Sequence, residues 1–211
     1  DVGATRFLNR CPGHVGRYLG LTGARLQAAD AVYCGLATHF VTQDRIDPLV
    51  ADLAATEPHR EPVGEILDRY ARTPGQAPLA TLQPAIDRCF ADDRVEAILE
   101  ALAAEPAISG ATADWAAQAR ASLLTKSPTS LKITLRQLTI GREYDLEAAL
   151  TLEYRLSQHV MAAHDFYEGI RAVLIDRDQQ PHWRPPTLAE VGEDTVNAYF
   201  APLGERELRF A

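Results

Sequence analysis

The sequence lacks the features that would place the protein in a membrane or on nucleic acid. No apolar run approaches the roughly 18 residues of a membrane span, and the first residues have neither the basic head nor the apolar middle of a signal peptide. Acidic residues outnumber basic ones, 29 to 21, and the basic ones are scattered. We therefore expect a soluble, cytoplasmic protein with no nucleic-acid partner and no membrane partner.

Cysteine is scarce as well, and the motifs of several hydrolase classes are missing. Cys11, Cys34 and Cys89 are odd in number and have no CxxC spacing, which predicts buried thiols in a reducing compartment. The six histidines form no HExxH motif and no spacing typical of a metal site, so we expect no metal. Without a Gly-x-Ser-x-Gly elbow, a serine hydrolase is disfavoured.

What the sequence does contain is strong helical periodicity, clearest between Ser127 and Trp183, where three consecutive helices are predicted. In the first, Ser127 suits the N-cap and Pro128 the first helical position. Leucines then recur at helical spacing up to residue 138, and Gly141 suits a left-handed residue at the helix end.

The second of these helices should open at Asp145 and end at His164. Its apolar seam is expected to consist of Ala149, Leu152, Leu156, Val160 and Ala163. Its polar face should hold Glu153, Arg155 and Gln158. Asp165 and Glu168 then match a capping box for a third helix that ends near Ile175.

The rest of the chain predicts short helices separated by proline and glycine. Helices that end at a glycine are expected over 14–22 and 27–34, before Gly23 and Gly35. A short strand is expected over 37–41. Further helices are predicted after Pro48 and over 63–71, 84–90, 95–104, 111–124 and 194–200.

Three blocks, in this order, resemble a known family. They read SPTSLKITLRQL, EYRLSQ and HDFYEGIRAVLIDRDQQPHWRP, and they are similar to the C-terminal third of 3-hydroxyisobutyryl-CoA hydrolases, a branch of the crotonase (enoyl-CoA hydratase/isomerase) superfamily. An earlier run, LTGARLQAADAVYCGLATHFV, resembles a signature found across that superfamily. It supports the fold without choosing between hydratase and hydrolase.

The resemblance implies site residues at the start of the chain. The run that begins with Asp1 is similar to a Pro-Asp-Val-Gly segment of these hydrolases, which makes Asp1 a candidate for the second of two catalytic carboxylates. Gly3 and Phe7 are candidates for contact with the substrate. Lys132 and Arg136, four residues apart on one helix face, are candidates for binding a coenzyme A phosphate, and an ordinary solvated helix face is the alternative.

The resemblance also implies that this chain is the C-terminal part of a longer protein. The parent crotonase fold is α/β, but this portion should be mostly α, because the β-rich N-terminal half is expected before residue 1. We expect 1–43 to end the crotonase core, 44–126 to be a helical region with proline-rich loops, and 127–211 to be a C-terminal helical region. The first catalytic Glu and the oxyanion donors should lie upstream, so the missing half is an expected partner. The oligomeric state stays open, a homo-oligomer included.

The function implied is hydrolysis of an acyl-CoA thioester, most similar to that of 3-hydroxyisobutyryl-CoA hydrolase in valine breakdown. Coenzyme A would be part of the substrate, and no separate cofactor is expected. The isolated chain should be inactive. An enoyl-CoA hydratase is one alternative, although hydratases commonly have Gly where this chain has Asp1. An inactive helical interaction module is the alternative of another class.

Overall fold

The computed structural model describes residues 3–56 and 62–210, and within these ranges it contains helices and no β-strand. The expectation of a mostly α portion is therefore confirmed. The strand predicted over 37–41 is wrong. In its place a single antiparallel bridge joins Phe40 to Arg72, whose backbone N–H donates to the Phe40 carbonyl at 2.8 Å. Neighbouring residues of the described chain add no further bridges, so this single pair does not form a β-ladder.

Contacts within the chain define two compact units, one of Asp1–Ala24 with Pro84–Ala211 and one of Arg25–Gln83. The boundaries predicted after residues 43 and 126 refer to regions of the parent fold and stay predictions. Each unit is described by itself below.

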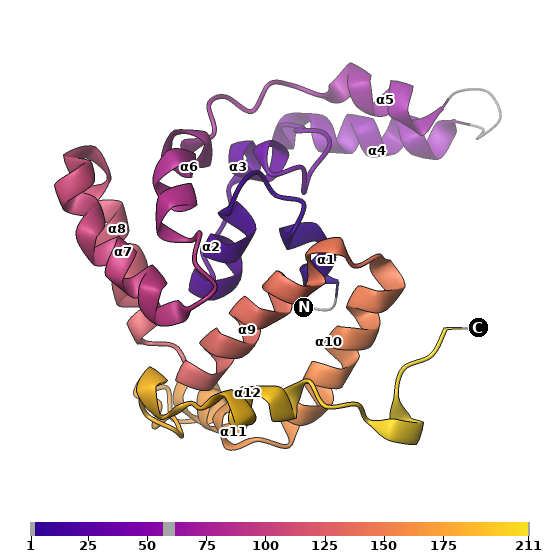
Figure 1. The fold of residues 1–211 in the computed structure, drawn as a ribbon. Helices are drawn as coiled ribbons and strands as arrows, with labels where there is room; N and C mark the ends of the chain where they lie inside the picture. Colours follow the sequence, from indigo (N-terminus) through magenta and orange to yellow (C-terminus); the bar gives the residue numbers. More distant parts are fainter. Residues whose placement is uncertain (1–2, 57–61, 211) are drawn as a thin grey trace. The chain divides into compact units, whose positions relative to one another are not determined.

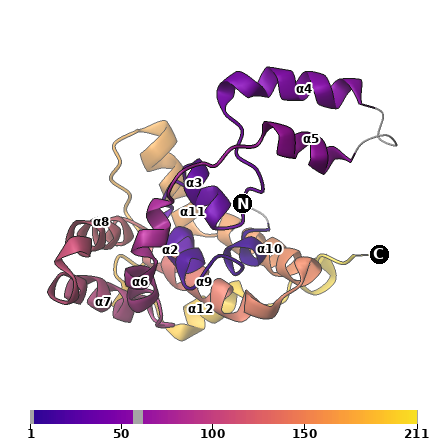
Figure 2. The same ribbon diagram turned by 90° about the horizontal axis from the view of Figure 1, so that it is seen from above.

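The smaller unit is built from short helices that side chains tie together. Its elements are α3 (Ala28–Tyr33), η1 (Gln43–Arg45), α4 (Ile46–Ala55), α5 (Val63–Tyr70) and the first half of α6 (Pro78–Cys89). Helices α4 and α5 lie side by side (Figures 1 and 2), and the Tyr70 hydroxyl donates to Asp52 at 2.6 Å. The buried Asp30 carboxylate accepts from Leu79 N at 2.9 Å, which explains why α6 begins six residues before the predicted start at 84.

The larger unit contains the three predicted consecutive helices. Its α-helices are α1 (Ala4–Leu8), α2 (Val15–Thr22), α7 (Val95–Ile108), α8 (Ala113–Leu124), α9 (Pro128–Ile140), α10 (Leu146–Met161), α11 (His164–Ile170) and α12 (Glu193–Tyr199). Short turns of 3-10 or π helix lie at 110–112, 141–143, 171–175, 188–190 and 204–206. Helices α7 and α8 pair, and α1 and α12 each contact both α9 and α10 (Figure 1).

Local capping signals in the sequence are confirmed. Ser127 Oγ accepts from Ser130 N at 3.1 Å at the start of α9, and Asp145 accepts from Ala148 N at 2.8 Å at the start of α10. Gly23 and Gly35 have φ of 69° and 71°, the left-handed conformation that ends a helix. These features depend on residues that are neighbours in sequence, which is why the sequence predicts them.

Gly141 corrects one of the predictions. Its φ is −80°, so it is not a left-handed residue, and it leads into the 3-10 turn at 141–143. The reason for glycine here is tertiary, because a Cβ at this position would lie 2.2 Å from Thr5 Cγ2. Helix α1 therefore packs directly against the backbone at the end of α9.

Three further expectations in this region are wrong. Glu153 is buried and not on a solvated face. His164 begins α11 and does not end α10. Asp165 and Glu168 do not form a capping box, since α11 has no side-chain cap and both carboxylates bond to other segments. The third helix does end at Ile175 as predicted, through a π-helical turn that starts at Arg171.

The cysteines are buried as expected, and no disulfide joins Cys11, Cys34 and Cys89. Cys89 lies beside Glu105, a fully buried carboxylate that accepts from Arg88 Nη2 at 2.5 Å and from Thr112 Oγ1 at 2.8 Å. Burial, and then the charge of Glu105, raise the pKa of the Cys89 thiol to about 11. This thiol is therefore protonated at neutral pH and is a structural group.

Three residues of the predicted apolar seam, Ala149, Leu152 and Leu156, are buried in α10, whereas Ala163 lies beyond this helix as the N-cap residue of α11. Leu152 and Leu156 form a buried cluster with Ile133 of α9. The partly buried rings of Tyr144, Tyr199 and Phe200 pack against this cluster.

Leu152→Asp tests this packing. Leu152 is 4% exposed, so the substitution places an unpaired carboxylate in the cluster, and we expect the free energy of unfolding to fall by about 3 kcal/mol or more. The control is Leu146→Asp in the same helix, where the side chain is 51% exposed and a negative charge suits the first turn. Urea denaturation followed by circular dichroism measures both. Equal midpoints for Leu152→Asp and the parent chain would contradict the packing described.

Candidate functional site

The segment expected to carry the catalytic carboxylate turns sharply into α1. Asp1 itself lies outside the described residues. Gly3 has φ of 96°, a conformation that glycine adopts readily, and its carbonyl accepts from Arg6 N at 3.1 Å. Phe7 lies on α1 with 41% of its surface exposed. The backbone of Gly3 is thus committed to a turn, while the Phe7 ring is accessible. Contact of either residue with a substrate stays a prediction.

A distant carboxylate holds this turn. Helix α1 has five residues and no cap from a neighbouring side chain. Instead, Glu153 of α10 accepts hydrogen bonds from Gly3 N and from Thr5 N, the latter at 2.6 Å. Glu153 is 7% exposed. Its buried carboxylate therefore takes the place of the N-cap side chain that the local sequence lacks.

Thr5 is the second point of attachment. It is fully buried, and its hydroxyl oxygen accepts from Gln137 Nε2 at 2.6 Å. Its carbonyl accepts from Asn9 Nδ2 at 2.9 Å, and Arg6 Nη1 donates to the Tyr144 carbonyl at 3.0 Å. The segment is therefore fixed from α9, from α10 and from the connection between them.

The sequence does not single out Glu153, because its residue type alone predicts a place on the polar face of the helix. The spacing contains the missing signal. Glu153 lies four residues after Ala149 and three before Leu156, so it shares the buried seam of α10. A carboxylate at a seam position predicts a buried partner, but the spacing does not reveal which segment supplies it.

A small polar cavity lies beside α1. Asn9, His14 and Arg142 are among the residues that line its volume of about 230 Å³. Burial, and then the nearby charge of Arg17, lower the pKa of His14, so its ring is neutral at pH 7. Arg17 is 6% exposed and is occupied by an ion pair with Asp93 and by the carbonyls of residues 90–92. Chemically, the cavity offers a neutral imidazole, an amide and the Arg142 guanidinium next to the candidate segment.

Lys132 and Arg136 lie together along a different cavity of about 460 Å³. Lys132 Nζ is 2.9 Å from a Glu96 carboxylate oxygen and donates to the Val191 carbonyl at 3.0 Å. Arg136 donates to Asn197 at 2.5 Å, and its guanidinium carbon lies 5.1 Å from the centre of the Phe200 ring. A coenzyme A phosphate would have to share or displace these partners. The structure does not bring residues 3–9 to this cavity, and phosphate binding stays a prediction.

A largely apolar cavity of about 510 Å³ lies where two of the resemblance blocks meet. It is lined from α9, α10 and α11 and by Trp183 and Tyr199. At its edge Ser127 Oγ donates to Asp165 at 2.5 Å, which joins the first block to the third. The volume suits a small apolar group.

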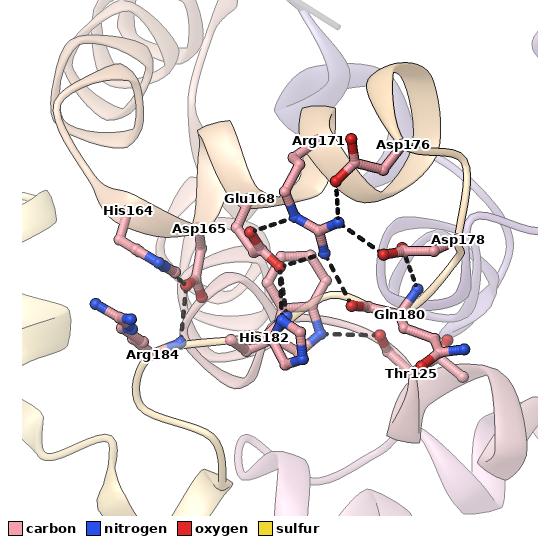
Figure 3. A network of polar contacts seen from close by, with 11 residues as sticks. Thr125, His164, Asp165, Glu168, Arg171, Asp176, Asp178, Gln180, His182 and Arg184 are labelled. Carbon is pink, nitrogen blue, oxygen red and sulfur yellow. Dashed lines mark hydrogen bonds and ion pairs between the residues drawn. The ribbon is translucent and has the colours of Figure 1, made fainter.

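The third block forms a charged clasp, shown in Figure 3, that folds residues 176–184 back onto α11. Arg171 donates to Glu168 at 2.8 and 2.9 Å, and at 2.7 Å to each of Asp176 and Asp178. Glu168 also accepts from His182 N at 2.6 Å. The hydrogen bonds from Arg171, then that from His182 N, lower the pKa of Glu168 to about 2. This block therefore has a structural role in the described chain.

The described residues contain no metal centre and no membrane span. Within 3–56 and 62–210, no three His, Cys, Asp or Glu side chains converge as metal ligands. No helix in the same ranges is long and apolar enough to cross a bilayer. The expectation that the protein needs no metal or cofactor stays a prediction.

Comparisons with known proteins cover nearly the whole chain. The family model described as enoyl-CoA hydratase/isomerase matches residues 1–200. The mitochondrial 3-hydroxyisobutyryl-CoA hydrolase of Xenopus laevis is 43% identical over 99% of this chain and 54% of its own length. The human protein of the same name is 41% identical over 100% of this chain and 54% of its own. The chain thus spans about half the length of the curated relatives it matches.

Solved structures agree with this relationship. A carnitinyl-CoA dehydratase from Mycobacterium thermoresistibile superimposes with a TM-score of 0.88 and 39% identity, over all of this chain and 57% of that one. An enoyl-CoA hydratase from Rhodobacter sphaeroides gives a TM-score of 0.84 and 36% identity, over all of this chain and 58% of that one. The relatives' names include the word mitochondrial, so the comparisons give no support to the predicted cytoplasmic location.

The clasp predicts a pH dependence of stability. The pKa of Glu168 is about 2 in the folded protein, against an ordinary value of 4.5, so the unfolded chain binds this proton more tightly. The stabilisation is therefore complete above about pH 4.5 and is lost as the pH falls towards 2. We expect Glu168→Gln to lower stability at pH 7 and to flatten the loss between pH 4.5 and 2.

Glu100→Gln is the matched control, because Glu100 is an exposed glutamate on α7. Urea denaturation at a series of pH values gives the free energy of unfolding for each protein. If Glu168→Gln has the same pH slope as the parent, the clasp does not contribute as described.

Proposed function

The chain belongs to the enoyl-CoA hydratase/isomerase family, and from this we propose that it is the C-terminal part of an acyl-CoA thioester hydrolase. The observation that carries the proposal is the identity of about 40% along the whole chain to proteins named 3-hydroxyisobutyryl-CoA hydrolase. We propose the same acyl-CoA as substrate, which would give the protein a role in valine breakdown. Coenzyme A enters as part of the substrate.

The proposed chemistry divides the catalytic groups between this chain and the part upstream of it. Hydrolysis of a thioester requires a carboxylate that activates water or attacks the carbonyl, a second acidic group that shares the proton, and N–H donors for the oxyanion. Asp1 would be the second acidic group. The first carboxylate and the oxyanion donors would come from the upstream part. The chain's own contribution is to hold the backbone that follows Asp1 and to supply Gly3 and Phe7 beside the substrate.

An enoyl-CoA hydratase is the second candidate, and a specific observation favours it. The two solved structures described above are named as a dehydratase and a hydratase, with identities of 39% and 36%. Asp1 and the SPTSLK and HDFYEG blocks favour the hydrolase, because the resemblance places these features there. The two reactions are distinguished by their products, since only the hydrolase releases free coenzyme A.

The test compares this chain with the full-length protein encoded by the same reading frame. We expect the full-length protein to release coenzyme A from 3-hydroxyisobutyryl-CoA and the chain alone to stay at background. Asp1→Asn in the full-length protein should lower the rate by about 10²-fold, the usual scale for an acid or base group. Asp114→Asn, at an exposed position of α8, is the control and should leave the rate unchanged.

Three outcomes would overturn parts of the proposal. Efficient hydration of crotonyl-CoA with the thioester intact would assign the hydratase instead. Thioester turnover by the chain alone would mean that its catalytic groups all lie within residues 1–211. A full-length protein inactive towards both substrates would favour the non-catalytic interaction module.

A further inference from the structure

Glu153 is a buried charge that the proposed chemistry does not use. It lies on α10, one turn after Ala149 in a helix face that otherwise packs apolar side chains. A carboxylate in such a position is costly unless hydrogen bonds satisfy it. In the described chain that requirement is met by the two backbone N–H groups of Gly3 and Thr5.

The two N–H groups that Glu153 binds lie close in sequence to the proposed catalytic residue. Gly3 is two residues after Asp1. Because only one residue separates Gly3 from Asp1, the position of Gly3 limits where the preceding residues of the chain can lie. Glu153 therefore holds the backbone two residues after the proposed catalytic residue, whereas Gln137 bonds the side chain of Thr5, two residues further along.

Close packing also restricts the segment at the start of α1. Thr5 is fully buried, and its methyl group lies against Gly141, where even a Cβ would clash. The segment therefore has little room to shift towards the end of α9. The Glu153 carboxylate holds the start of the same segment, since it accepts from the backbone N–H of Gly3.

We propose that Glu153 is a positioning residue, whose buried carboxylate fixes the backbone after Asp1 and so sets the place of the Asp1 carboxylate relative to the thioester. This inference rests on the function proposed above. Its physical basis is that a displacement of about 1 Å in a reacting group costs up to about 10²-fold in rate, even when the change is made away from the chemistry.

Glu105 supplies a matched control. It is also a buried glutamate in the larger unit, and its carboxylate is held by Arg88 and Thr112 between α6, α7 and the turn at 110–112. Within the described residues, Glu105 bonds to Arg88, Cys89 and Thr112, and these bonds do not reach residues 3–9. Its substitution disturbs a buried carboxylate of comparable burial without touching the segment that follows Asp1.

The experiment uses the full-length protein with 3-hydroxyisobutyryl-CoA, and it measures kcat and KM separately. In Glu153→Gln one oxygen still accepts, but the amide NH₂ faces the other N–H group, so one hydrogen bond is lost. We expect kcat to fall by about 10- to 100-fold while KM changes by less than about 3-fold. Glu105→Gln should keep kcat within about 2-fold of the wild type at temperatures where it is folded.

A second variant covers the case in which Glu153→Gln does not fold. Glu153→Asp keeps the charge but ends one methylene short, so it can hold one N–H group and not both. We expect its kcat to lie between those of the wild type and Glu153→Gln. A wild-type kcat for Glu153→Asp or a folded Glu153→Gln overturns the proposal, as does a loss of kcat in Glu105→Gln of the same size.

Amide hydrogen exchange separates this inference from the proposed function. Exchange of the peptide covering residues 3–9 should accelerate by about 10-fold or more in Glu153→Gln and stay unchanged in Glu105→Gln. If the wild type hydrolyses no thioester, the proposed function fails, while accelerated exchange still supports Glu153 as the residue that fixes this backbone. If exchange is unchanged in Glu153→Gln, the positioning role is wrong whatever the activity.

Discussion

The hydrogen bonds between the Glu153 carboxylate and the start of α1 fix the backbone of the candidate site in the larger unit. This contact joins residues up to 150 positions apart and places a charge where α10 would otherwise be apolar. The cost of burying that charge is offset only while both backbone N–H groups stay in place. The contact is therefore specific for one arrangement of α1 on α10, and slipped arrangements would leave the carboxylate unsatisfied.

Similar buried or half-buried acids organise the rest of the unit. Glu105 binds Arg88 and Thr112 at the connection between α7 and α8, and Glu168 with Arg171 folds the following loop back onto α11. Several helices here have only five to eight residues, such as α1, α2, α11 and α12. Helices of that length are marginal alone, so tertiary contacts of this kind keep them folded.

The contact between Glu153 and α1 is relevant to an active site whose catalytic groups come from two parts of one protein. In the proposed function the reacting carboxylates come from two parts of one protein, and each must stand in place before the substrate binds. A site of this kind needs supports behind the reacting groups as much as the groups themselves. In this proposal Glu153 supplies such a support at α1. Lys132 and Arg136, in contrast, have partners within the fold.

The sequence by itself determined the helical character of the chain, the caps at Ser127 and Asp145, the glycine stops at 23 and 35, and the apolar seam around Leu152 and Leu156. Each follows from residues within a few positions of one another, where capping and helical spacing act directly. The family resemblance also follows from the sequence alone, because it depends only on the order of the residues.

Only the tertiary structure decided the roles of Glu153 and Gly141. Glutamate on a helix is usually solvated, and glycine after a helix usually takes a left-handed turn, so local rules assigned both residues wrongly. Glu153 is buried because α1 brings two N–H donors to it, and Gly141 is required because Thr5 occupies the space of a side chain. These contacts join segments more than 130 residues apart, a separation at which no local spacing carries information.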